Sequence, residues 1–255
     1  VSDRPANRGQ VQRTTKHSGC PASKRNLNSY SNIFRQLLTA RKVTSLAGET
    51  MWLGSAWIIS IVFHPLLMPT YLNAIIFKYC TDLLPLTREA KVQMLIFVFV
   101  STYLVPSLAT GILWATGAIS SLSLEKRSER LIPLLVTAVI YTGVSYVFLD
   151  YLSMARLLGL FMGTVALSVI ITAFITHFWK ISSHMVGVGG LVGFVFAVVY
   201  QTHNFSLEYP LIGSIAVAGA VGSSRLYLKA HSPKQIVAGF LLGIVLSWSA
   251  VTFFV

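Results

Sequence analysis

Seven long apolar segments dominate this chain and restrict its fold more than any other feature of the sequence. They cover roughly residues 52–77, 92–119, 132–150, 155–178, 185–201, 209–224 and 235–255. About 20 apolar residues let a helix cross the hydrocarbon core of a bilayer. The segments lack the alternating polarity of transmembrane strands, which excludes a closed barrel. The sequence therefore predicts an all-α, polytopic bundle of transmembrane helices.

The composition supports a membrane location. Hydrophobic residues make up 54% of the chain, charged residues only 11%, and the mean hydropathy is +0.68. A soluble domain carries about 25% charged residues. So few charges cannot cover a water-exposed surface, which excludes a soluble enzyme, a secreted disulfide-rich module and a disordered tail.

The number of crossings depends on the first segment, which contains Pro65 and Pro69. Proline removes a backbone donor and kinks or breaks a helix. The segment is therefore expected to form either one kinked helix or a re-entrant pair of short helices. The bundle accordingly has six or seven membrane segments.

Residues 1–50 differ from the rest of the chain. They hold 9 of the 20 Lys and Arg residues but only 2 of the 8 acidic ones, so they account for most of the net charge of +12. They cannot bury enough apolar surface to fold alone. We interpret 1–50 as a basic, disordered extension before a transmembrane domain at 51–255. It is either an upstream extension, with translation beginning at Met51, or a native tail on the membrane surface. The expected partners are membrane lipids and not nucleic acid.

Three polar stretches are predicted to lie on the same side of the membrane. They are residues 120–131, 179–184 and 225–234, and each is two crossings from the next. Ionisable groups at the ends of membrane helices are costly and often functional. These stretches combine two histidines with several cations at the starts of helices, where amide groups add partial positive charge. Such an arrangement suits a phosphate group, with arginine as a bidentate donor.

The last stretch carries the most specific pattern. Ser224-Arg225, five residues, His231, three residues and Gln235 follow one another. This resembles the last signature of the type-2 phosphatidic acid phosphatase and vanadium haloperoxidase superfamily, in which the final residue is Asp. The stretch 181–184, Ile-Ser-Ser-His, resembles the Pro-Ser-Gly-His signature of that superfamily. Residues 126–133 stand where its first signature, Lys, six residues and Arg-Pro, belongs. The resemblance covers roughly residues 120–245.

The resemblance implies covalent phosphoryl transfer without a metal or other cofactor. By position, His231 is the nucleophile that forms a phosphohistidine, Gln235 orients it, and His184 protonates the leaving group. Four further residues are implied to hold the phosphoryl oxygens: Arg225, Ser182, Arg130 and Lys126. Phosphoryl transfer depends mainly on such positioning and positive charge.

Two departures from the superfamily pattern affect this interpretation. Gln235 replaces the aspartate; it can accept the imidazole N–H four residues away on a helix but supplies no negative charge. Losing such a carboxylate lowers turnover about 10⁴-fold in a serine-protease triad. The first signature is also altered. Lys126 lies seven residues before Pro133 instead of eight, and Ile132, not arginine, precedes the proline.

Two functions stay open. One is a lipid-phosphate phosphatase or phosphotransferase acting on a substrate such as phosphatidic acid or a polyprenyl diphosphate. The other is a catalytically weak or inactive relative that binds anionic lipid headgroups or has a structural role. A transporter or channel is less well supported, because no inverted repeat or midplane charge is evident. The oligomeric state is left open.

The remaining features are interpreted structurally. His64, His177 and His203 are expected to be packing or interfacial residues. Glycines of 187–193 and 239–243, spaced by three or four residues, predict close helix packing. We expect a plasma (inner) membrane protein. Its orientation is undecided, because without residues 1–50 and the proposed phosphate ligands four cations face each side.

Overall fold

The computed structural model describes residues 51–81, 84, 86–122, 124, 126–151 and 156–254. The predicted extension at 1–50 lies outside the described residues. Within them the chain is helical and contains no strand, which confirms the all-α prediction. Seven helical spans are long and apolar enough to cross a membrane, so the chain has the architecture of an integral membrane protein.

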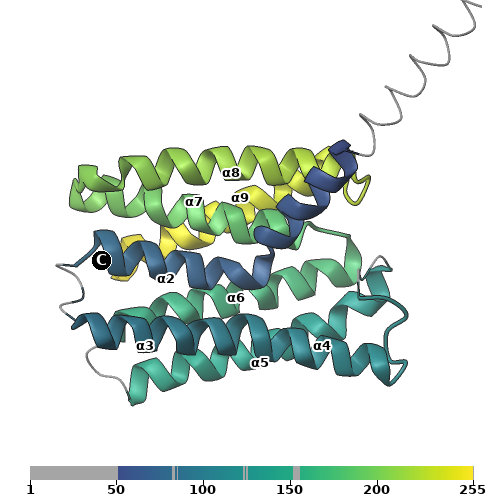
Figure 1. Ribbon diagram of the computed structural model, residues 1–255, viewed down its shortest axis with the longest axis horizontal. Helices are drawn as coiled ribbons and strands as arrows, with labels where there is room; N and C mark the ends of the chain where they lie inside the picture. The colour runs from purple at the N-terminus through teal and green to yellow at the C-terminus, as the bar shows by residue number, and fades with distance from the viewer. Residues whose placement is uncertain are drawn as a thin grey trace, which may run out of the picture. The chain divides into compact units, whose positions relative to one another are not determined.

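The elements follow one another as a series of long antiparallel helices (Figure 1). The first span contains a helix over 51–62, the 3₁₀ turn η1 (Pro65–Leu67) and α2 (Met68–Tyr79); the second contains α3 (Arg88–Phe99), the π-helical turn η2 (Val100–Leu104) and α4 (Val105–Ala115). The other spans are α5 (Arg127–Asp150), α6 (Arg156–Phe178), α7 (Ser183–Thr202), α8 (Glu208–Tyr227) with the preceding 3₁₀ turn η4 (Phe205–Leu207), and α9 (Pro233–Phe254).

The first span is broken at His64 and Pro65. Pro65 has no N–H to continue the helix, and the His64 amide donates to the carbonyl oxygen of Ile61 at 3.2 Å. The His64 side chain then caps η1 by accepting a hydrogen bond from Leu66 N–H. In Figure 1 the helix over 51–62 meets α2 at a marked angle, and the two halves lead to opposite ends of the bundle. The segment is therefore one broken crossing and not a re-entrant pair.

The helices α7 and α9 pack against each other along a seam of glycines. A Cβ atom added at Gly189 would lie 2.3 Å from the carbonyl oxygen of Phe240, and one at Gly243 would lie 2.2 Å from that of Val186. Real Cβ atoms do not approach backbone this closely. Only glycine fits these positions, which confirms the close packing predicted from the spacing of small residues.

The helix α5 pairs with α6 and begins earlier than expected. The sequence placed its start near residue 132, whereas the structure starts it at Arg127. Arg130 and Pro133 are therefore helical. Pro133 lies inside α5, beyond its first turn, so its missing N–H removes one hydrogen bond of the helix. This early start moves Arg130 from a loop onto a rigid element.

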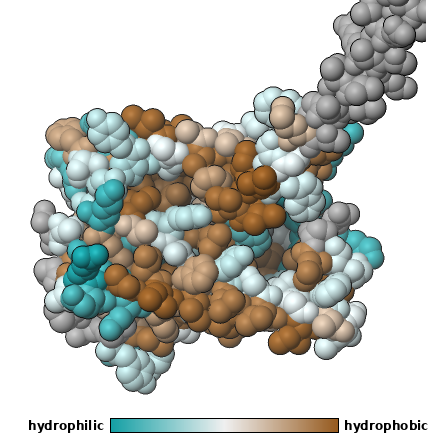
Figure 2. All heavy atoms as spheres, viewed as in Figure 1, coloured by the Kyte–Doolittle hydropathy of each residue, from teal (hydrophilic) through white to brown (hydrophobic). Residues whose placement is uncertain are grey.

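The three polar stretches come together at one end of the bundle, as predicted. The connections from α4 to α5, from α6 to α7 and from α8 to α9 all lie at the right-hand end of Figure 1. Apolar side chains gather over the middle of the face shown in Figure 2, and hydrophilic groups lie towards its ends. This distribution matches a bundle whose middle faces lipid tails.

Candidate functional site

A cavity of about 330 Å³ lies where the three polar stretches meet. Three histidines and two arginines contribute to its wall, namely His64, His184, His231, Arg130 and Arg225. Its other lining residues are apolar or carry hydroxyl groups, and none is acidic. We call it the polar cavity. Its positive charge and lack of carboxylates make it suited to an anion.

His231 lies just before α9 and is held by Gln235 in the first turn of that helix. The His231 Nδ1 atom is 3.2 Å from the Gln235 Oε1 atom, and the Ser232 amide donates to the same oxygen at 3.1 Å. A backbone N–H can only donate, so the Gln235 carbonyl oxygen, and not its NH₂ group, must face this position. Nδ1 of His231 must then carry the hydrogen. The lone pair of the neutral ring therefore lies on Nε2.

The environment of His231 keeps its ring neutral. The side chain is only 7% exposed. Burial, together with the positive charges of Arg130 and Arg225, lowers the pKa of the His231 imidazole to about 3. The hydrogen bond to Gln235 favours the charged form but does not offset these effects. At neutral pH the ring thus retains the unprotonated nitrogen that a nucleophile needs.

His184 lies in the first turn of α7 and is oriented by the first membrane span. Its Nε2 atom is 3.2 Å from the carbonyl oxygen of Ser60. Since a carbonyl only accepts, Nε2 carries the hydrogen and Nδ1 bears the lone pair of the neutral ring. The His64 ring packs edge-on against the His184 ring with a centroid distance of 5.4 Å.

The two arginines reach the polar cavity from different helices. Arg225 lies in the last turn of α8; its Nη1 atom donates to Ser60 Oγ at 3.4 Å, and its Nε atom is buried without a hydrogen-bond partner. Arg130 is 9% exposed, and its Nε atom donates to the carbonyl oxygen of Leu124 at 2.6 Å. Leu124 has a positive φ of 49°, so the connection before α5 is bent at this residue.

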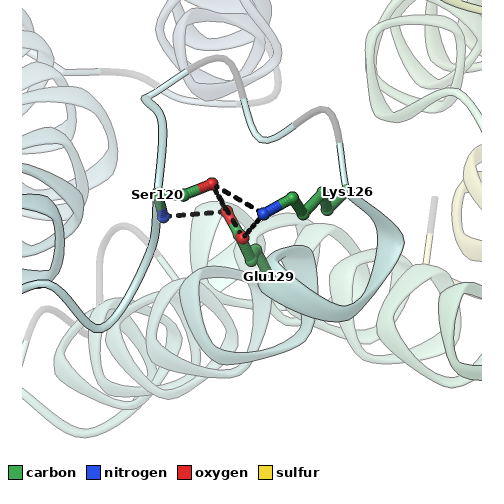
Figure 3. Close-up of polar contacts among 3 residues, drawn as sticks. All are labelled: Ser120, Lys126 and Glu129. Atoms are coloured by element: carbon green, nitrogen blue, oxygen red, sulfur yellow. Dashed lines mark hydrogen bonds and ion pairs between the residues drawn. The ribbon is translucent and has the colours of Figure 1, made fainter.

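Lys126 does not line the polar cavity. Its side chain is 69% exposed and forms an ion pair with Glu129 at 3.3 Å. Glu129 also accepts hydrogen bonds from the amide and hydroxyl groups of Ser120 (Figure 3). These contacts tie Ser120, in the α4–α5 connection, to the first turn of α5. Lys126, which lies seven instead of eight residues before Pro133, thus contacts Glu129 in α5 and not the polar cavity.

Ser182 also lies outside the cavity lining. It is fully buried at the N-cap position of α7, and its Oγ atom has no hydrogen-bond partner. Its neighbour Ser183 lines the cavity instead. Of the seven site residues predicted from the sequence, four line the cavity (His231, His184, Arg225 and Arg130), and Gln235 supports His231 from behind.

The contribution of the first span to the cavity was not predicted from the sequence. His64, which we interpreted as a packing residue, lines the cavity, and Ser60 contacts both His184 and Arg225. The signal available was a histidine directly before a proline inside a membrane segment, because that break exposes both a side chain and a free carbonyl. No cluster of three or more metal-ligating side chains occurs within the described ranges.

Comparison of the chain with protein-family models, with curated proteins and with solved structures finds no match. We therefore infer the chemistry of the site from its geometry. That geometry combines a neutral imidazole held through Nδ1, a second imidazole, and two arginines without a carboxylate among the lining residues. Imidazoles and arginines in this arrangement can supply a nucleophile, a proton carrier and a binding site for an anion.

Proposed function

We propose that the protein is a membrane-embedded lipid-phosphate phosphatase or phosphotransferase that acts through a phosphohistidine intermediate. The observation that carries this proposal is His231, which is held through Nδ1 by Gln235 in a cavity with two arginines. The resemblance of residues 224–235 to the superfamily signature agrees with the same assignment.

In the first step, Nε2 of His231 attacks phosphorus, and the bond from phosphorus to the leaving oxygen breaks. Before this step, the negative charge of the bound phosphate lets the neutral His184 take up a second proton on Nδ1, and His184 then gives that proton to the leaving oxygen. Arg225 and Arg130 neutralise the charge on the phosphoryl oxygens. Nδ1 of His231 keeps its hydrogen and continues to donate it to the Gln235 carbonyl oxygen. The dipole of that carbonyl stabilises the phosphorylated ring.

In the second step, a water or an acceptor alcohol attacks the phosphohistidine. His184, now neutral, takes the proton from the attacking oxygen. The bond from Nε2 to phosphorus breaks, which releases phosphate or a new phosphoester and restores both histidines. This chain needs no further cofactor for these two steps, since each proton taken from His184 is returned to it.

A lipid substrate is supported by the surroundings of the polar cavity. A second, mainly apolar cavity of about 100 Å³ shares five lining residues with it: Pro65, Leu66, Leu134, Thr137 and Ser183. The methylene groups nearest the headgroup can occupy the apolar cavity while the phosphate occupies the polar one. Phosphatidic acid or a polyprenyl diphosphate has this chemistry. The bilayer supplies such substrates laterally, and we place the protein in the plasma (inner) membrane.

The test is phosphate release by the purified protein in detergent, with lipid monophosphates and diphosphates as substrates. Replacing the nucleophile in His231→Ala should abolish release. His203→Asn is the matched control, since His203 is exposed at the opposite end of the bundle and Asn tolerates its left-handed backbone. Release that survives in His231→Ala, or none from a folded wild-type protein, would refute the phosphatase.

The neutral Gln235 favours one alternative, a catalytically weak or inactive protein that binds anionic lipid headgroups or has a structural role. An amide cannot stabilise the developing imidazolium as a carboxylate does. Gln235→Glu keeps the side-chain length and adds the charge, and Gln235→Asp restores the superfamily residue. Turnover that appears only in these variants would establish the alternative, whereas wild-type turnover would exclude it.

A further inference from the structure

We infer that the break in the first membrane span completes the phosphate site, and that His64 is a further phosphate-binding residue that donates from Nε2–H. This inference rests on the proposed function, because it names a ligand contact in the same cavity. It adds a residue from a span that contains none of the three polar stretches.

The hydrogen bonds of His64 determine which ring nitrogen is a donor. Its Nδ1 atom accepts a hydrogen bond from Leu66 N–H at 3.3 Å. Nδ1 therefore holds the lone pair, and in the neutral ring the hydrogen lies on Nε2. Nε2–H has no hydrogen-bond acceptor among the residues that the structure describes, and the ring lines the polar cavity.

The neighbours of His64 do not supply that acceptor. Its ring lies edge-on to His184 at 5.4 Å and to Tyr103 at 6.3 Å between centroids. Arg225, on the same cavity wall, has a buried Nε atom without a partner. His64 and Arg225 thus line one cavity whose lining residues include no carboxylate. The buried Arg225 Nε–H is costly to leave unpaired. A phosphate bound in this cavity offers several acceptor oxygens to His64 Nε2–H and to the Arg225 guanidinium.

The break also explains why the first span reaches this site. In an unbroken helix the carbonyl oxygen of Ser60 would accept the amide hydrogen of His64. That amide instead bonds to Ile61, which leaves the Ser60 carbonyl for His184 Nε2. Ser60 Oγ meanwhile accepts from Arg225. A single local break therefore places an imidazole in the cavity and orients two other site residues.

A purely structural role for His64, as the cap of η1, makes a different prediction. Asn is a strong N-cap residue, so His64→Asn preserves the acceptor for Leu66 N–H. Its side chain ends short of the Nε2 position. Gln is longer and places an amide donor near that position. Comparing His64→Asn with His64→Gln therefore distinguishes the role of His64 as a hydrogen-bond donor to phosphate from its role as the N-cap of η1.

The experiment is isothermal titration calorimetry of inorganic phosphate into the full-length protein in detergent. We expect His64→Asn to weaken phosphate binding by roughly ten- to a hundredfold, as for loss of a hydrogen bond to a charged group. His64→Gln should retain most of the affinity, and the control His203→Asn should bind like the wild type. Melting temperatures of all variants show that they are folded.

The outcomes separate this inference from the proposed function. Wild-type affinity in a folded His64→Asn, or equal losses in the Asn and Gln variants, would overturn the role of His64 as a donor and leave the phosphate site in place. Absence of phosphate binding to the wild type would overturn both. Loss in His64→Asn with recovery in His64→Gln supports the inference even without measurable turnover.

Discussion

The glycine seam between α7 and α9 predicts a large effect from one methyl group. In Gly243→Ala, the new Cβ would lie 2.2 Å from the Val186 carbonyl oxygen and 2.5 Å from the Gly190 amide nitrogen. Ordinary van der Waals contact begins at 3.4 Å. The two helices must therefore separate by about 1 Å, because both clashing atoms belong to backbone. Overpacking of this kind costs about 1–3 kcal/mol.

The matched control is Gly213→Ala on α8. Gly213 is exposed and has no atom within 4 Å of an added Cβ. Alanine is favoured over glycine in a helix by about 1 kcal/mol, so this variant should be as stable as the wild type or slightly more stable. Thermal unfolding of both variants in the same detergent, followed by intrinsic fluorescence, measures the difference.

The same substitution should impair the proposed reaction. His184 lies in the first turn of α7 and Gln235 in the first turn of α9, so separating the helices moves the two histidines apart. A displacement of 1 Å can lower turnover by about 10²-fold. The packing argument for this seam is wrong if Gly243→Ala has a melting temperature equal to or higher than that of Gly213→Ala and keeps full phosphate release.

Four further predictions concern the polar cavity. His231 should stay neutral down to about pH 3, which ¹⁵N NMR of labelled histidine measures; a ring that titrates near 6.5 would contradict the assigned environment. Since its pKa is lower in the folded than in the unfolded state, His231 should cause stability to fall as pH drops from about 6.5 to 3, by at most about 1.4 kcal/mol per pH unit; melting temperatures of wild type and His231→Gln should converge in that range. Gln235→Glu should raise the His231 pKa above 3, because the carboxylate stabilises the imidazolium; an unchanged NMR titration would mean that the side chains do not touch. Arg225→Gln should abolish phosphate binding in calorimetry, whereas Lys126→Gln should leave it unchanged, and the reverse ranking would refute the placement of the exposed lysine.

The sequence was sufficient to predict features that depend on local pattern. Apolar runs predicted the spans, and counting crossings placed the polar stretches at one end. The spacing of four residues predicted that Gln235 faces His231, and the two side chains are 3.2 Å apart. Each of these follows from helix periodicity or chain length alone, without knowledge of which helices are neighbours.

Features that depend on contacts between distant segments were not predictable. His184 bonds to a carbonyl 124 residues earlier, and this contact exists only because Pro65 breaks the first span beside α7. Lys126 was assigned to phosphate from its position in the sequence. The nearby pair of Ser120 and Glu129 gives its ammonium group closer partners in the connection itself. Sequence spacing does not reveal that Ser120 and Glu129 compete with the cavity for the Lys126 ammonium group.

The glycine seam also determines how the site responds to the bilayer. Membranes of different thickness change the tilt of the helices within them. Where two helices touch backbone to backbone, they tilt as one body, so the elements that carry His184 and Gln235 keep their spacing. Arg130 lies on α5, which is paired with α6. A change in lipid thickness therefore acts on the distance between Arg130 and the two histidines, and the composition of the bilayer becomes a control on the site.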